Sequence, residues 1–135
     1  MRLISVVYKL LDGEAAYLDT LADLRGHELG CELLLNFDDA PTRFVTWASS
    51  PCQYCIGVFE KPQFEGQHES RDMSGSAPWR ELIGRDISLA YLDESHQVLR
   101  AGDESKAVFL SSVDDAGGWQ ADVLRITDHR PQVST

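Results

Sequence analysis

The sequence predicts an α+β domain that is mostly antiparallel sheet, built from two similar halves that each contain a helix followed by a β-meander. Three observations support this fold class. Short runs rich in Val, Ile, Leu, Phe, Tyr and Trp follow one another closely and are separated by turn residues, which is typical of antiparallel hairpins. Two segments carry helical apolar spacing or helix-boundary residues. A short motif also occurs once in each half of the chain.

The individual elements are predicted from these patterns in chain order. Residues 2–10, RLISVVYKL, fit either a strand or the start of a helix. Residues 14–24 carry apolar side chains at helical spacing, and Gly26 stands where a helix often ends. The stretch SAPWRELIG, residues 76–84, predicts one or two further helical turns that begin at Pro78. Strands are expected near residues 31–37, 42–48, 54–60, 86–92, 97–101, 106–112 and 119–127.

The repeated motif reads L-x-G-x-acid-aliphatic. It occurs as LRGHEL at residues 24–29 and as LIGRDI at residues 82–87, and further strand-like runs follow each copy. The sequence therefore predicts half-repeats at about 14–60 and 77–127. The segment between them, residues 61–78, is rich in Gly, Ser, Pro and charged residues and predicts an exposed loop.

The chain has the length of one domain and a strongly acidic composition. We expect its 135 residues to fold as a single domain, 1–135. Lys and Arg number 12 against 22 Asp and Glu, which gives a net charge of −10. This charge argues against nucleic acid and against an anionic membrane surface as partners, because both attract basic surfaces. Solubility alone would account for an excess of acids, and the more specific interpretation is a basic protein as partner.

The sequence also indicates a cellular compartment. No apolar run approaches the roughly 20 residues that a membrane-spanning helix needs. The N-terminal stretch is interrupted by Lys9 and Asp12 and lacks a small-residue cleavage site, so no signal peptide is predicted. We therefore expect a cytoplasmic protein, in which cysteine thiols stay reduced.

Three cysteines and one histidine have the spacing of a zinc site. His27 and Cys31 form an H-x3-C pair and Cys52 and Cys55 a C-x2-C pair, so together they would supply the Cys3His ligand set of a structural zinc ion. The competing interpretation is that the cysteines are reduced packing residues, since free cysteine behaves as a small apolar residue. The alignment of the two halves favours packing, because it places Cys31 opposite Leu89. Redox catalysis is disfavoured, because a strand-like run follows the C-x-x-C pair instead of a helix.

Acidic doublets occur at four of the predicted turns. Asp is a common turn residue, so turn chemistry accounts for much of this pattern. Successive turns of a meander alternate between the two ends of a sheet, however, so the turns at 93–96 and 113–118 are expected at the same end. If the halves pair side by side, the turn at 38–39 would join them in an acidic rim that binds a basic partner. The predicted partner-binding residues are Asp38, Asp39, Asp93, Glu94, His96, Asp114, Asp115 and Trp119.

The second half of the chain carries a family resemblance. The run PWRELIGRDISLAYLDESHQVLRAGDESKAVFLSS contains a W-x-x-L-x-G-x-x-I entry, Trp79 to Ile87, followed by a predicted meander. It resembles small uncharacterised bacterial proteins and some immunity proteins of bacterial toxin systems. The resemblance implies a compact acidic protein that occludes a partner, often a basic toxin domain, and it implies no catalytic residue.

Motifs of catalysis are missing from the sequence, which contains no nucleophile elbow, phosphate-binding loop or H-E-x-x-H. The prediction is therefore a non-enzymatic, acidic protein-binding module of the inhibitor or immunity type, with no cofactor. The alternative is a small metalloprotein or enzyme that uses a zinc ion held by His27, Cys31, Cys52 and Cys55.

Overall fold

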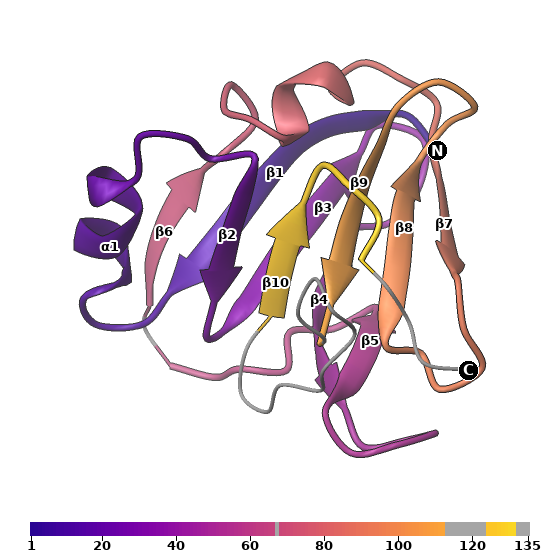
Figure 1. The fold of residues 1–135 in the computed structure, drawn as a ribbon, viewed down its shortest axis with the longest axis horizontal. Helices are drawn as coiled ribbons and strands as arrows, with labels where there is room; N and C mark the ends of the chain where they lie inside the picture. The colour runs from indigo at the N-terminus through magenta and orange to yellow at the C-terminus, as the bar shows by residue number, and fades with distance from the viewer. Residues whose placement is uncertain (67, 113–123, 132–135) are drawn as a thin grey trace.

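The structure is a computed structural model that describes residues 1–66, 68–112 and 124–131. Within these residues the chain forms ten β-strands, one short α-helix and one turn of 3-10 helix (Figure 1). The strands make two five-stranded antiparallel sheets. In chain order the elements are β1 (Leu3–Leu10), α1 (Glu14–Thr20), β2 (Gly26–Leu29), β3 (Glu32–Phe37), β4 (Arg43–Ala48), β5 (Cys55–Phe59), β6 (Glu69–Asp72), η1 (Trp79–Glu81), β7 (Ser88–Tyr91), β8 (Val98–Gly102), β9 (Ala107–Ser111) and β10 (Leu124–Thr127).

The first sheet has the strand order β5-β4-β3-β1-β6. Strands β3, β4 and β5 form a meander, and β1 pairs with β3 on one side and with β6 on the other. Burial alternates along most of β1, where Val6, Tyr8 and Leu10 face the core. The register with β3 shifts between Leu3 and Ser5. This irregularity adds a residue to β1, so Leu3 is also buried although its spacing from Val6 is odd.

The second sheet has the order β2-β10-β9-β8-β7. Strands β7 to β10 form a meander in chain order, as the sequence predicts for this half. The edge strand β2, however, comes from the first third of the chain and pairs with β10 (Figure 1). The chain therefore crosses from the first sheet to the second after α1 and returns at β3.

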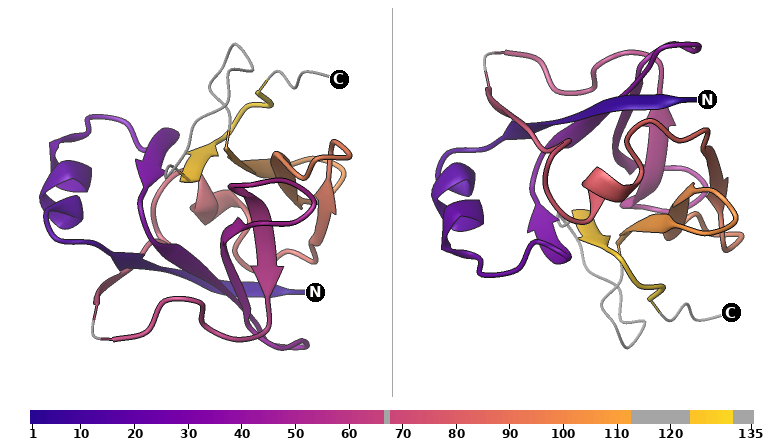
Figure 2. Two further views of the ribbon diagram at one scale, coloured as in Figure 1. Left: turned by 90° about the horizontal axis from the view of Figure 1, so that it is seen from below. Right: turned by 90° about the horizontal axis from the view of Figure 1, so that it is seen from above.

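The two sheets share one buried core. Its members come from strands of both sheets and include Trp79 of η1, which is fully buried. Seen from above in Figure 2, η1 lies inside the outline that the strands of the two sheets form. The segment after η1 runs along the start of β1, where the Leu3 amide donates to the Arg85 carbonyl at 3.1 Å and the Gly84 amide to the Leu3 carbonyl at 2.7 Å.

Three polar side chains inside this core, those of Tyr8, His27 and Trp79, are linked by hydrogen bonds. Nδ1 of His27 lies 2.9 Å from the Leu24 carbonyl oxygen, which only accepts, so Nδ1 carries the hydrogen. Nε2 of His27 therefore accepts from the Tyr8 hydroxyl at 2.8 Å, and the Tyr8 oxygen accepts from Nε1 of Trp79 at 2.6 Å. Burial lowers the pKa of His27 and raises that of Tyr8, so both side chains are neutral. The network joins β1, β2 and η1.

The predicted α+β class is wrong, because the described residues are mostly β. The helix predicted over residues 14–24 ends at Thr20, and Leu21 is already extended. Gly26 begins strand β2 instead of ending a helix, and the SAPWRELIG segment forms a single 3-10 turn. The helix of the first segment is shorter than predicted because residues 26–29 pair with β10, which apolar spacing does not specify. Among the described residues, no helix has both the length and the apolar character to span a bilayer.

The prediction of two helix-plus-meander halves is also wrong. Residues 26–29 form β2 in the second sheet, whereas the aligned residues 84–87 lie outside the named strands and run beside residues 1–3. The matching letters share a buried aliphatic residue, Leu29 and Ile87, but their glycines differ, because Gly26 begins β2 whereas Gly84 is left-handed with φ 84°. The predicted loop 61–78 contains strand β6, a polar edge strand that pairs with β1 through its backbone and so needs no apolar pattern.

Candidate functional site

The C-x-x-C segment forms a tight turn before β5. The Cys55 amide donates to the Cys52 carbonyl at 3.4 Å, and Tyr54 between them adopts a left-handed conformation with φ 57°. Cys55 is fully buried, Cys52 is half-buried, and both thiols are free. Because β5 starts at Cys55, the turn is fixed to the edge of the first sheet.

This turn contacts the turn between β7 and β8 in the second sheet. The Cys52 thiol donates to the Ser95 carbonyl at 3.1 Å. The Ile56 amide donates to the His96 carbonyl at 2.8 Å, and the Tyr91 hydroxyl donates to the Ile56 carbonyl at 2.7 Å. Hydrogen bonds from both segments therefore hold the edges of the two sheets together at this corner.

The β7–β8 turn, residues 93–96, is itself well ordered by hydrogen bonds. The Asp93 carboxylate accepts from the Gln97 and Val98 amides, each at 3.0 Å. His96 is left-handed with φ 58°, and its ring stacks on Tyr91 with 3.7 Å between centroids and 3° between planes. Glu94 is exposed at the tip. Asp93 thus shapes the turn, and Glu94 offers a free carboxylate to solvent.

An aromatic groove adjoins the C-x-x-C turn. It has a volume of about 600 Å³. Two residues of the turn, Gln53 and Tyr54, form part of its wall. We define the aromatic groove by its lining residues, which are Trp47, Ala48, Ser49, Ser50, Gln53, Tyr54, Phe59 and Gln63.

A buried ion pair positions the far wall of the groove. Glu32 is fully buried, and its carboxylate accepts from Nζ of Lys9 at 2.5 Å and from the Gln63 amide at 3.1 Å. Nζ of Lys9 also lies 3.4 Å from the Phe64 carbonyl. These contacts hold residues 63–64 over the first sheet, where the Phe64 ring packs edge-on against Trp47 at 6.1 Å between centroids.

The indole nitrogen of Trp47 is unusual in this wall. The Trp47 ring packs against Tyr54, with 6.3 Å between centroids and 88° between planes. Its Nε1 atom is buried and has no hydrogen-bond partner. An unpaired buried donor costs about 1–3 kcal/mol. One residue that lines the groove therefore carries a buried donor without a partner.

The predicted zinc ligands are not gathered as a set. Cys52 and Cys55 lie together in the turn, but both ring nitrogens of His27 are engaged by Tyr8 and by the Leu24 carbonyl. Cys31 is fully buried beside β3, and burial raises the pKa of its thiol to about 11. Over the described ranges, no group of three or more His, Cys, Asp or Glu side chains has a metal-binding arrangement.

The predicted acidic rim is divided between two ends of the molecule. Asp38 and Asp39 are exposed and bind Arg2, whose side chain donates to Asp38 and whose amide donates to Asp39 at 2.8 Å. Arg2 also pairs with Asp86, just before β7. Asp93 and Glu94 follow the other end of β7, so at about 3.3 Å per residue the two doublets lie more than 10 Å apart. Asp114, Asp115 and Trp119 lie outside the described residues.

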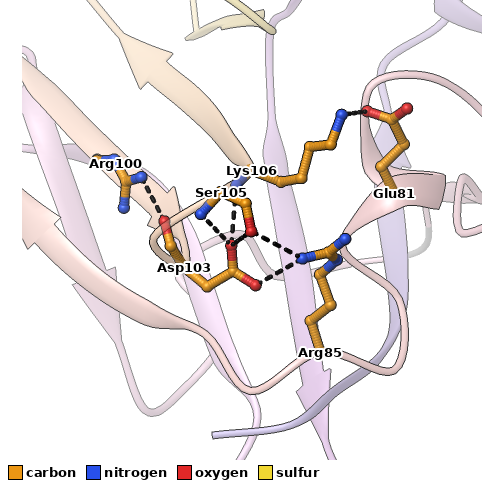
Figure 3. A network of polar contacts seen from close by, with 6 residues as sticks. All are labelled: Glu81, Arg85, Arg100, Asp103, Ser105 and Lys106. Atoms are coloured by element: carbon orange, nitrogen blue, oxygen red, sulfur yellow. Dashed lines mark hydrogen bonds and ion pairs between the residues drawn. The ribbon is translucent and has the colours of Figure 1, made fainter.

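A second polar network surrounds the β8–β9 turn, at the opposite end of β8 (Figure 3). The Asp103 carboxylate accepts from Nη1 of Arg85 at 2.8 Å and from the amides of Ser105 and Lys106, both at 2.9 Å. Arg85 and these amides hold the pKa of Asp103 well below its usual range. Nζ of Lys106 lies 3.6 Å from the Glu81 carboxylate. The cations at this end are therefore largely paired with acids.

Sequence reasoning identified Cys52, Cys55, Asp93, Glu94 and His96, which the structure brings to one corner. It missed the aromatic groove beside them. A signal was available, because aromatic residues flank the C-x-x-C on both sides in TWASSPCQYCIGVF. Their convergence depends on the pairing of β4 with β5, which a linear pattern does not specify.

In comparisons with known proteins, no protein-family model, no curated protein and no solved structure matches the chain.

Proposed function

We propose that the chain is a non-enzymatic protein-binding module that docks a basic partner at one corner of the molecule. This docking corner consists of the aromatic groove and the adjoining turn of residues 93–96. The observation that carries the proposal is that a groove lined by Trp47, Tyr54 and Phe59 adjoins the C-x-x-C turn, which the Cys52–Ser95 hydrogen bond joins to the acidic turn of residues 93–96.

The groove has the features of an interaction hot spot. Trp and Tyr dominate the binding energy of many protein interfaces, because they bury large areas with little loss of side-chain entropy. Trp47, Tyr54 and Phe59 are each half-buried, so a part of every ring faces the hollow or solvent. The polar rim is supplied by Gln53 and Gln63, whose amides can donate and accept hydrogen bonds. A partner side chain that is apolar or aromatic would fill the hollow.

Charge indicates the second property of the partner. The chain carries a net charge of −10. Glu94 is exposed in the turn that Cys52 contacts, and the side chain of Glu60, next to Phe59, is 78% exposed at 3.9 Å from Arg43. Such exposed carboxylates add little affinity one by one, but they accelerate association with a basic partner. We therefore expect the partner to present an apolar side chain flanked by Lys or Arg.

Nuclear magnetic resonance tests the proposal with a defined probe. ¹⁵N-labelled protein is titrated with the peptide Lys-Lys-Phe-Lys-Lys, and the indole signal of Trp47 is assigned by its loss in Trp47→Phe. We expect the peptide to shift the Trp47 indole signal and the amides of Gln53, Tyr54 and Glu94, because these groups line the docking corner. The acidic peptide Glu-Glu-Phe-Glu-Glu is expected to leave them unchanged.

Matched charge reversals locate the binding surface. Glu94 and Glu104 are both exposed and occupy equivalent positions in the turns at the two ends of β8. Glu94→Lys is expected to weaken peptide binding roughly twofold to fivefold at low salt, the range of an exposed charge contact. Glu104→Lys changes the net charge by the same amount and is expected to leave binding near the wild-type value. Equal effects of the two variants, or a Trp47 signal that the basic peptide does not move, would overturn the proposal.

A further inference from the structure

We propose that Cys52 and Cys55 form a reversible disulfide that weakens binding at the docking corner. The chemical part of this inference concerns the two thiols alone, and its regulatory part rests on the proposed function. The modifying reagent belongs to the class of low-molecular-weight disulfides, such as oxidised glutathione.

The geometry of the turn suits a disulfide. The amide of Cys55 bonds to the carbonyl of Cys52, so the two residues are the ends of a four-residue turn. The ends of such a turn have Cα atoms less than about 7 Å apart, and disulfides need about 4.4–6.8 Å. The thiols are close enough to influence each other, because the Cys55 side chain is one of the groups that raise the pKa of Cys52, after burial.

The two thiols differ in access, which sets the order of reaction. Cys52 is half-buried and its neighbours Pro51 and Gln53 are exposed, so a small disulfide can reach it. Cys55 is fully buried, and its thiol donates to the Ser50 carbonyl at 3.3 Å. We therefore expect Cys55 to react with the Cys52 sulfur and not with a small disulfide from solvent. Cys31 is fully buried at the start of β3 and is not expected to react.

The reaction proceeds by two thiol–disulfide exchanges. The Cys52 thiol loses its proton to solvent, and its thiolate attacks one sulfur of oxidised glutathione, which breaks the S–S bond and releases one glutathione thiolate. The Cys55 thiolate, formed by loss of a second proton, then attacks the Cys52 sulfur and releases the second glutathione. The protein is oxidised by two electrons, and one glutathione disulfide is reduced to two thiols. A dithiol such as dithiothreitol reverses both steps.

The disulfide changes the docking corner in two ways. A disulfide sulfur carries no hydrogen, so the bond from Cys52 to the Ser95 carbonyl is lost, and with it one link between the groove and the acidic turn. Gln53 and Tyr54 become part of the closed ring, and both line the groove. We expect oxidised protein to bind the Lys-Lys-Phe-Lys-Lys peptide at least twofold more weakly than reduced protein.

Mass spectrometry of the intact chain tests the chemistry without any partner. After incubation with oxidised glutathione, wild-type protein is expected to lose two hydrogen atoms and to regain them with dithiothreitol. Cys55→Ser is expected to stop at a glutathione adduct on Cys52, and Cys52→Ser to stay unmodified. Peptide mapping of oxidised wild-type protein places the bond without any substitution. A bond that includes Cys31, or wild-type protein that carries only adducts or no change, would overturn the disulfide.

The peptide titration, repeated on the reduced and oxidised wild-type protein, separates the two proposals. If reduced protein fails to bind the peptide at the docking corner, the proposed function fails while the disulfide result stands on its own. If both forms bind equally well, the regulation is refuted and the proposed function remains. Weaker binding by the oxidised form, restored by dithiothreitol, supports both.

Discussion

Two turns at opposite ends of β8 begin with the same three residues, Asp-Glu-Ser, at residues 93–95 and 103–105. In both turns the first Asp accepts hydrogen bonds from two backbone amides that follow it. The carboxylate closes the turn in both places. The bonding pattern differs, because Asp93 bonds to the amides of residues 97 and 98, whereas Asp103 bonds to those of residues 105 and 106.

The surroundings of the two turns differ. The turn at 93–96 lies against the other sheet, receives bonds from Cys52 and Ile56, and leaves Glu94 exposed. The turn at 103–106 is exposed, and Arg85 neutralises its Asp103 (Figure 3). Local sequence thus supplies the carboxylate that closes each turn, while tertiary packing sets the surroundings of that turn and of its acids.

The largest expected difference concerns the two turn-closing acids. Asp93→Ala leaves the amides of Gln97 and Val98 without an acceptor, and Val98 is fully buried, so we expect a loss of about 2 kcal/mol in the free energy of unfolding. Asp103→Ala is expected to cost less, because water can reach the exposed amides of Ser105 and Lys106. Urea unfolding of both variants measures the difference. The comparison breaks down if Asp103→Ala is the more damaging substitution.

Removing one hydrogen bond between the sheets is expected to lower the free energy of unfolding by a smaller amount. Tyr91→Phe deletes the hydroxyl that donates to the Ile56 carbonyl but keeps the ring that stacks on His96. We expect a loss of about 1 kcal/mol in unfolding free energy. Amide signals of residues 93–96 should shift in the variant, whereas those of residues 103–106 should stay in place. Shifts of equal size in both turns would show that the two turns are not independent.

The smallest expected effect is a pH dependence confined to the β8–β9 turn. The folded pKa of Asp103 lies below the value of about 3.9 for an unfolded chain, so its contribution is complete above that pH and is lost as the pH falls through the folded pKa. Asp103→Asn has no such contribution, so the stability gap between wild type and variant should narrow below about pH 4. Urea unfolding between neutral and acidic pH measures the gap.

Glu104→Gln is the control for this pH dependence, because it removes an adjacent exposed carboxylate and leaves the hydrogen bonds of Asp103 intact. A gap between wild type and Asp103→Asn that stays constant down to acidic pH would contradict the role of Arg85 in holding the Asp103 charge.

Much of the strand content was predictable from local pattern. The predicted strands near 31–37, 42–48 and 54–60 correspond to β3, β4 and β5, because apolar and β-branched side chains alternate there over short runs. Cys31 and Cys55 are buried, as the packing interpretation expects. At the site, the turn of residues 93–96 and the C-x-x-C pair were singled out from their letters alone.

The remaining features depend on contacts between distant residues. Gly26 was predicted to end a helix, but in the structure it begins β2. Only the pairing of β2 with β10 decides between the two. The polar strand β6 exists because β1 offers it a free edge. His27 was predicted as a metal ligand because the sequence does not reveal its hydrogen bond to Tyr8, which in turn accepts from Trp79. These three residues come from elements that lie far apart in the sequence.

The place of β2 in the second sheet has a consequence for the order in which the chain assembles. Residues 26–29 pair with residues 124–127, so β2 is synthesised long before its partner exists. Until then its backbone is an open edge that carries Leu29 and His27, both of which end up buried. Because β2 and β10 lie far apart in the sequence, their pairing is expected to be a slow and late step of folding. A nascent or truncated chain that stops before β10 is therefore expected to expose this edge and to need shielding from aggregation.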